Sequence, residues 1–158
     1  MSQIASFTYL KESDVPFLGF WSKPKPRLFR KPESKFVEWL QQHTLRESIF
    51  EAADGVYVAL VFAWLELEGE WIDSEADPVL HTVRKHVGGS HWLVKPNDLR
   101  STFLIKQPLS ENDWPSFLGK IGDDKDYYHW PCFDVARHFV TERLLELQTG
   151  EAMLVSVG

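Results

Sequence analysis

At 158 residues the chain has the length of one domain, and a domain of this size buries roughly 70% of the surface that its unfolded chain exposes. It carries 17 basic and 23 acidic residues, which argues against a nucleic-acid partner, because phosphate backbones are bound by clustered lysines and arginines. The single cysteine, Cys132, excludes an intramolecular disulfide and a disulfide-stapled secreted scaffold. We expect one domain over residues 1–158 in a reducing compartment.

The N-terminus and the longest apolar stretch bear on localisation. The first residues lack the cationic segment and the long apolar run of a signal peptide. The apolar stretch Val56–Leu67 is well short of the ~20 residues that span a bilayer. We therefore expect a soluble, cytoplasmic protein without a membrane partner.

The first third of the chain predicts one strand and two helical segments. Ile4–Leu10 alternates along its length and is rich in aromatic and β-branched residues, which indicates a strand. A helix from Ser34 to His43 is predicted because the serine can cap its N-terminus. One or two further turns are predicted over Glu47–Ala53, and the breaker Asp54-Gly55 ends them.

A basic loop precedes the first of these helices. Residues 22–35 hold three prolines and six of the 17 basic residues against one acid, Glu33. The rest of the chain therefore carries 11 basic and 22 acidic residues, so the charge is unevenly distributed. The loop is either a solvated segment that keeps the protein soluble or, if its side chains converge in space, a contact for an anion or phosphate.

The stretch Val56–Leu67 is apolar all round, so its periodicity does not separate a helix from a strand. Its length, the lack of an internal glycine or proline, and Gly69 just beyond its end favour a helix. Val56, Val58 and Val61 would suit a strand. We expect a buried helix that serves as the central packing surface.

The remaining two thirds predict further helices and two more strands. Helices are predicted where a capping residue or a proline precedes an apolar face, at 77–87, 97–105, 110–122 and 131–148. Ser90–Lys95 predicts an interior strand and Ala152–Val157 a final one. The expected fold class is α+β (mixed α/β): a small sheet that includes both terminal strands, packed against five or six helices around the helix at 56–67.

Three segments carry a resemblance to a known family. They are an opening Met-x-x-Ile-x-x-Phe strand followed by a short helix, a His-Trp-Leu-Val segment after Gly88-Gly89, and a last helix that runs through a short turn into a strand ending on Val157-Gly158. These segments resemble the uncharacterised bacterial YfbM-like family. The resemblance implies a compact bacterial cytoplasmic α/β domain. Orphan domains of this kind commonly act as the immunity partner of a secreted antibacterial toxin.

Catalytic and metal-binding signatures are missing from the sequence. It contains no Gly-rich phosphate loop, Gly-x-Ser-x-Gly elbow, His-Glu-x-x-His or Cys-x-x-Cys. His81, His86 and His91 are five residues apart, a spacing that does not bring them to one helical face. Cys132 and His138 are six apart and face nearly opposite sides of the predicted helix, so a structural role for the cysteine is favoured. We expect no catalytic residue, no metal and no cofactor.

Two acidic segments that contain aromatic rings are the most informative stretches. Exposed rings anchor a protein interface, and surrounding carboxylates steer a cationic partner toward it. The alternative for residues 123–130 is an acidic turn whose rings fold back onto the core. The predicted partner-binding residues are Asp123, Asp124, Asp126, Tyr127, Tyr128 and Trp130 in one segment, and Glu68, Glu70, Trp71 and Asp73 in the other.

These observations leave functions from different classes open. The first is an immunity protein that binds a cytoplasm-acting bacterial toxin domain and neutralises it by occluding a basic active site. The alternative is a small-ligand or anion-binding enzyme of unknown reaction, built from the basic loop at 23–31 and the histidines. A flat acidic surface favours the first, and a deep pocket lined by Arg27, Arg30 and a histidine favours the second. A structural subunit of a larger complex is the third.

Overall fold

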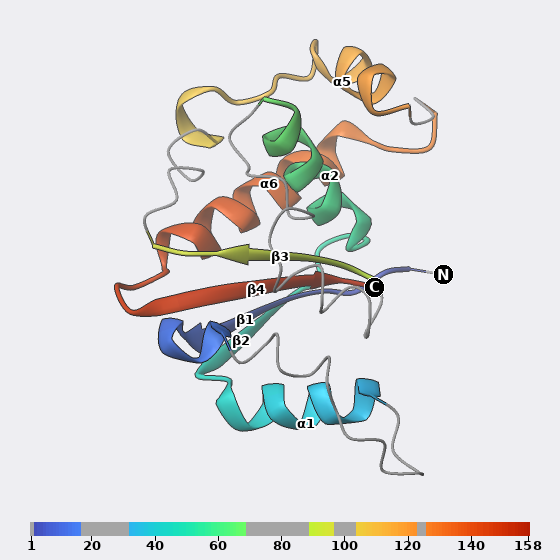
Figure 1. The fold of residues 1–158 in the computed structure, drawn as a ribbon. Coiled ribbons are helices and arrows are strands. Elements are labelled where there is room, and N and C mark those ends of the chain that lie inside the picture. The colour runs from blue at the N-terminus through green and yellow to red at the C-terminus, as the bar shows by residue number, and fades with distance from the viewer. Residues whose placement is uncertain (1, 17–31, 69–88, 97–103, 123–125) are drawn as a thin grey trace.

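The computed structural model describes residues 2–16, 32–68, 89–96, 104–122 and 126–158 (Figure 1). They form a four-stranded antiparallel sheet in the order β2-β1-β4-β3, with α1 on one face and α2, α5 and α6 on the side of the other. The predicted α+β class is confirmed. The strands are β1 (Ala5–Lys11), β2 (Arg46–Phe50), β3 (Ser90–Val94) and β4 (Glu151–Val157), and the helices are α1 (Pro32–His43), α2 (Val56–Leu67), α5 (Trp114–Ile121) and α6 (Trp130–Leu145).

The sheet includes both terminal strands, as expected, and they pair with each other at its middle. Their register runs from Ala5 opposite Val157 to Lys11 opposite Glu151. Beyond the register, the backbone N–H and C=O of Ile4 and Gly158 exchange two hydrogen bonds of 3.1 Å. The long antiparallel ladder therefore holds both ends of the described chain together.

Two predictions about strands are wrong. The segment predicted as helical turns at 47–53 is instead strand β2, which pairs with β1 from Ala5 to Tyr9. Its side chains alternate, with Phe50 buried and Ile49 exposed, so pairing with a neighbouring strand outweighs the local helical preference. Strand β3 was expected in the interior, but in the described sheet it pairs with β4 alone and lies at an edge.

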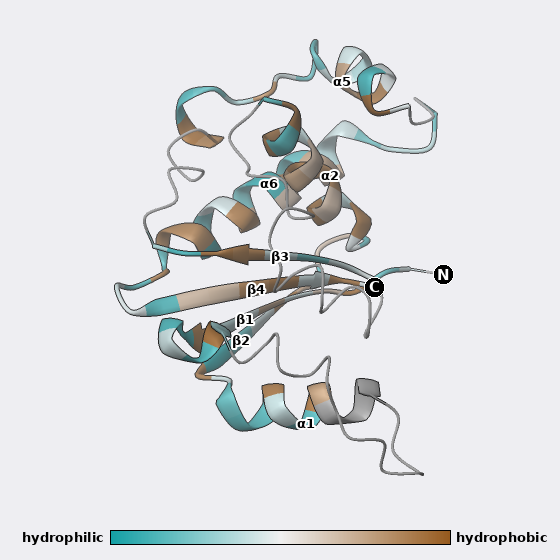
Figure 2. Cartoon of the chain, viewed as in Figure 1, coloured by the Kyte–Doolittle hydropathy of each residue, from teal (hydrophilic) through white to brown (hydrophobic). Residues whose placement is uncertain are grey.

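The alternation of side chains along the strands divides the interior into two cores. On one face of β1, Ala5, Phe7 and Tyr9 join the main core beneath α2 and α6. On the other face, Leu10 joins a smaller core that includes Phe36 of α1. Figure 2 shows the apolar strands lying between the helical layers.

Helix α2 confirms the central role predicted for Val56–Leu67. Val58, Val61, Phe62 and Leu65 have no exposed surface, which fits a helix that is apolar all round. Phe62 stacks on Trp92 of β3 with ring centroids 4.7 Å apart. The β-branched residues that would suit a strand are accommodated because the helix is buried on nearly every side.

The start of α2 is fastened to the start of β1. The carboxylate Oδ1 of Asp54 accepts hydrogen bonds from the backbone N–H groups of Gln3 at 3.1 Å and Val56 at 3.0 Å. The N–H of Gly55 donates to the carbonyl of Gln3 at 2.8 Å. The Asp-Gly pair that the sequence marks as a breaker thus positions the helix against the sheet.

A charged cluster ties three strands to the end of α6. Arg46 of β2 makes two hydrogen bonds, of 2.6 and 2.8 Å, to the carboxylate of Glu151 of β4, across the intervening strand β1. Its guanidinium lies 3.9 Å from the ring centroid of Tyr9. The Tyr9 hydroxyl donates to the carbonyl of Arg143 at 3.2 Å, and burial raises the pKa of this phenol to about 12. The cluster closes one end of the main core.

We expect Arg46→Met to lower the free energy of unfolding by about 1 kcal/mol at pH 7. The hydrogen bonds from Arg46 hold the pKa of Glu151 below its usual value. The contribution of the pair is therefore complete above the pKa of an unfolded glutamate, about 4.3, and is lost as the pH falls through the lower folded value.

Urea denaturation at pH 7, 5 and 3 measures this difference between the wild type and the variant. The gap should shrink between pH 5 and pH 3. The matched control is Lys106→Met, which removes a cation from an exposed position on another segment. A gap that stays constant down to pH 3 would contradict the assignment to the Arg46–Glu151 pair.

Candidate functional site

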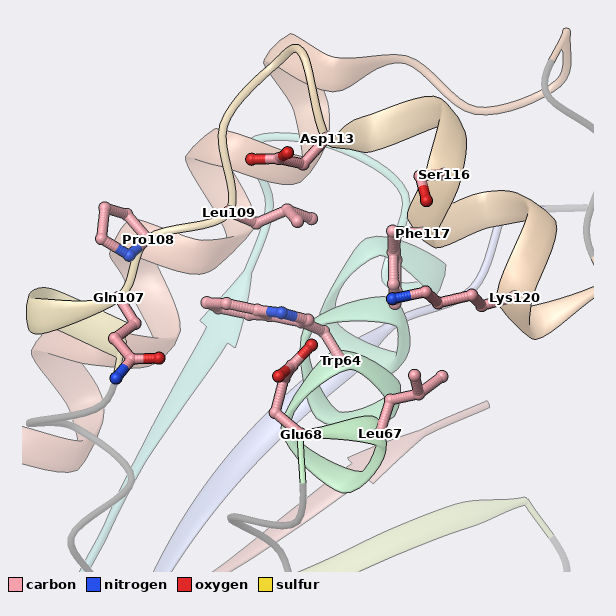
Figure 3. A pocket seen from close by; sticks show the side chains of 10 residues that line it. All are labelled: Trp64, Leu67, Glu68, Gln107, Pro108, Leu109, Asp113, Ser116, Phe117 and Lys120. Carbon is pink, nitrogen blue, oxygen red and sulfur yellow. The ribbon is translucent and has the colours of Figure 1, made fainter.

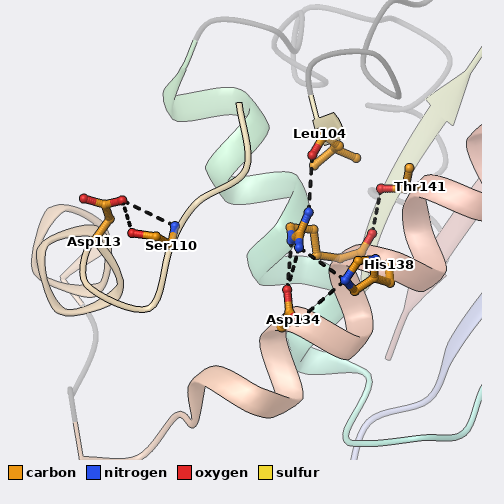
Figure 4. Close-up of polar contacts among 7 residues, drawn as sticks. Leu104, Ser110, Asp113, Asp134, His138 and Thr141 are labelled. Atoms are coloured by element: carbon orange, nitrogen blue, oxygen red, sulfur yellow. Dashed lines mark hydrogen bonds and ion pairs between the residues drawn. The ribbon is translucent and has the colours of Figure 1, made fainter. Parts of the chain in front are cut away.

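The candidate site lies around α5 and the two ends of α2. Two hydrogen bonds hold the turn before α5: the hydroxyl of Ser110 donates to Oδ2 of Asp113 at 2.5 Å, and its N–H donates to the same oxygen at 3.3 Å (Figure 4). These bonds hold the pKa of Asp113 below its usual value. Gly122 caps the C-terminus of α5, and its φ of +77° is readily adopted only by glycine.

An aromatic cluster joins α2, α5 and α6 beneath this site. Phe133 of α6 is fully buried at its centre, with ring centroids 4.6 Å from Trp114, 6.0 Å from Phe117 and 6.4 Å from Trp64. The fourth neighbour is Trp130, at 5.7 Å. The cluster is a rigid apolar base because its rings interlock in edge and tilted geometries.

Some aromatic rings of the predicted acidic segment fold back onto the core, and one is exposed. Trp130 is half-buried at the start of α6 and packs on Trp114 and Phe133, as expected for a ring that folds back onto the core. Tyr128 is half-buried against Tyr57 of α2, with centroids 5.8 Å apart. Tyr127 is 72% exposed and meets Tyr128 edge to face at 4.9 Å, as expected for an interface anchor.

Two of the predicted partner-binding carboxylates, Asp126 and Glu68, are described in the structure, and they lie apart from each other. Asp126 is exposed next to Tyr127, near the start of α2, where Tyr57 contacts Tyr128. Glu68 is exposed directly after the end of α2. A twelve-residue helix is about 18 Å long, so the two acidic groups do not converge on one point. The other predicted partner-binding residues, Asp123, Asp124, Glu70, Trp71 and Asp73, lie outside the described residues.

A pocket of about 300 Å³ opens between the end of α2, the segment before α5, and α5 itself (Figure 3). Sequence reasoning missed it, because its walls come from three segments without a shared motif and only Glu68 was singled out beforehand. Trp64 carried no signal that distinguished it from an ordinary core residue. The lining residues are Trp64, Leu67, Glu68, Gln107, Pro108, Leu109, Asp113, Ser116, Phe117 and Lys120.

Cys132 and its neighbouring histidines lie at the start and in the middle of α6. Cys132 is half-buried against the main core. The backbone N–H of His129 donates to the Tyr57 hydroxyl at 3.0 Å, and burial raises the pKa of that phenol. The imidazole of His138 is mostly exposed and lies 3.6 Å from the carboxylate of Asp134. The His129 bond links the start of α6 to α2, whereas the His138 contact lies within α6.

A second set of polar contacts joins α6 to the segment before α5. The guanidinium of Arg137 contacts Oδ1 of Asp134 at 2.6 Å and donates to the carbonyl of Leu104 at 3.3 Å (Figure 4). The hydroxyl of Thr141 donates to the carbonyl of Arg137 at 2.8 Å. The hydrogen bond to Leu104 therefore fastens α6 to the segment before α5.

Within the ranges that the structure describes, no three His, Cys, Asp or Glu side chains are grouped to hold a metal ion. Among the same ranges, every helix is too short or too polar to cross a membrane. The basic loop at 23–31 and the predicted helix at 77–87, with His81 and His86, lie outside them.

Comparison with known proteins gives no match. Neither a family model, nor a curated protein, nor a solved structure corresponds to this chain at a significant level. The YfbM-like resemblance therefore stays a prediction.

Proposed function

We propose that the chain is an immunity protein that binds a cytoplasm-acting bacterial toxin domain and neutralises it by covering a basic active site. The observation that carries the proposal is the exposed ring of Tyr127 beside the exposed carboxylate of Asp126. Tyrosine is enriched among residues that dominate binding energies, because it buries a large apolar area and still offers a hydroxyl. An adjacent carboxylate adds attraction to a cationic partner.

The packing behind Tyr127 supports this proposal. Tyr127 contacts Tyr128, which contacts Tyr57 of the buried helix α2. The Tyr57 hydroxyl in turn accepts the hydrogen bond of the His129 backbone N–H. A ring that is already supported in this way loses little conformational freedom on binding, which favours affinity.

The charge of the chain supports a basic partner. The formal net charge is −6, and outside residues 22–35 acidic residues outnumber basic ones by two to one. Domains that act on nucleic acids or nucleotides use cationic side chains to bind phosphate. Complementary fields accelerate association, which matters for a protein that must intercept a toxin quickly.

Asp126 and Glu68 are close enough to lie in one interface. A standard interface covers about 800 Å² on each partner, a patch on the order of 30 Å across. Asp126 and Glu68, at opposite ends of an α2 about 18 Å long, fit within such a patch. This function places the chain in the cytoplasm together with the toxin domain.

Co-purification from the native host, followed by identification of the partner, tests the proposal. We expect the wild type to retain one basic protein in a one-to-one complex and to inhibit its activity. The double variant Tyr127→Ala/Asp126→Lys should weaken that complex at least about 100-fold, since interface anchors contribute about 2 kcal/mol or more each. Both side chains are exposed, so the fold should be retained.

The control replaces an exposed apolar residue and an exposed carboxylate on the opposite side of the sheet. Val37→Ala/Glu38→Lys alters two exposed positions of α1 and should leave the affinity unchanged. Trp130 is not a suitable probe, because its packing on Trp114 and Phe133 would mix stability with binding. Retention of no protein by the wild type, or equal affinity of both double variants, would overturn the proposal.

A further inference from the structure

The pocket between α2 and α5 has an apolar floor. Trp64 of α2 and Phe117 of α5 are each only 3% exposed and close its base. Leu67, which is 43% exposed, and the half-buried Leu109 form part of the walls. Figure 3 shows these side chains surrounding one hollow. At about 300 Å³ the hollow is at the lower end of the size of ligand sites, enough for one long side chain and too small for a helix.

The rim of the pocket is polar and carries more negative than positive charge. Glu68 and Asp113 bring carboxylates from different elements, and Lys120 of α5 brings one ammonium. The Ser110 hydrogen bonds lower the pKa of Asp113, so this carboxylate is ionised at neutral pH. An occupant with an apolar stem and a cationic end therefore matches the pocket better than an anion does.

We propose that this pocket receives an arginine side chain of the protein partner. This inference rests on the proposed function and names one contact of that complex. The three methylenes of an arginine match the apolar floor and walls, and its guanidinium offers donors in several directions to carboxylates on different sides. A lysine ammonium is more strongly hydrated and presents a single point of charge, so it fits this arrangement less well.

Because Lys120 and Glu68 carry opposite charges, removing each charge should change the binding of a cation in opposite directions. Removing the charge of Glu68 weakens binding of a cation, and removing the charge of Lys120 strengthens it. A pocket that binds its occupant through apolar contact alone would respond to neither change. Both residues are exposed, so Glu68→Gln and Lys120→Gln should leave the fold intact.

The probe is N-acetyl-arginine amide, with N-acetyl-citrulline amide as the uncharged ligand of the same shape. Nuclear magnetic resonance of the Trp64 indole N–H should show a saturable shift with the arginine compound and binding at least tenfold weaker with citrulline. Glu68→Gln should weaken arginine binding about fivefold, and Lys120→Gln should strengthen it about threefold. Glu142→Gln, an exposed carboxylate of α6 outside the pocket lining, is the matched control and should change nothing.

Equal binding of arginine and citrulline, or no shift at Trp64, would overturn the inference. In the complex, Ser116→Trp fills the pocket from an exposed position and should weaken partner binding at least tenfold. If the partner binds Ser116→Trp as it binds the wild type, the inference fails while the proposed function stands. If the wild type retains no protein, the proposed function fails. The proposal that the arginine belongs to a partner protein then fails with it.

Discussion

Gly55→Ala is expected to lower the free energy of unfolding by about 2–3 kcal/mol. A Cβ atom at this position would lie 2.7 Å from the backbone N of Ala5 and 2.7 Å from the carbonyl O of Gln3. Both neighbours are backbone atoms, so relief requires α2 and β1 to move apart. That movement would stretch the 2.8 Å hydrogen bond from Gly55 to Gln3.

The effect is steric and does not come from backbone conformation. The φ of Gly55 is −58°, a value that alanine adopts freely, and alanine has the higher helix propensity. Urea denaturation measures the change, with Gly158→Ala as the control, because a Cβ there meets nothing within 4 Å. A Gly55→Ala variant as stable as Gly158→Ala would show that the junction of α2 and β1 is looser than described.

Phe133→Ala should cost about 3–5 kcal/mol, because it empties the centre of the aromatic cluster. Phe133 has no exposed surface and touches four rings, from α2, α5 and α6. The loss combines the transfer free energy of the ring with the cavity that it leaves. Urea denaturation followed by tryptophan fluorescence reports the stability and the average environment of the seven tryptophans, which include Trp64, Trp114 and Trp130.

The control for this variant is Val135→Ala, two residues along α6 and 46% exposed, which should change stability by no more than about 0.5 kcal/mol. Phe133→Leu keeps most of the apolar volume and should cost less than the alanine variant. If Phe133→Ala unfolds at the same urea concentration as Val135→Ala, the cluster does not support α5, and the rigid base assigned to the candidate site would have to be abandoned.

Local patterns predicted most of the described elements because their information lies within each segment. The alternation of Ile4–Leu10, the length of Val56–Leu67 and the prolines near the starts of α5 and α6 correspond to observed elements. Strand β2 was missed because five residues of mixed polarity become a strand only by pairing with β1, more than thirty residues earlier. Its identity depends on a partner that its own residues do not specify.

The candidate site was predicted in part. The exposed ring of Tyr127 follows from an acidic, polar neighbourhood, whereas the inward packing of Trp130 depends on Trp114 and Phe133, which lie on different helices. The pocket was not predicted, because Trp64 and Phe117 are spaced as ordinary core residues in their own helices. They form a floor only because the fold brings the end of α2 close to α5.

The central pairing of β1 with β4 has a consequence for biosynthesis. The ribosome makes β1 first and β4 last of the described strands, yet β4 lies between β1 and β3. Until Val157 has left the ribosomal tunnel, the sheet lacks a central strand and β1 and β3 have no ladder to join them. The ladder between β1 and β4 therefore joins residues as far apart in the sequence as Ala5 and Val157, and closing so long a loop is a late and slow step of folding.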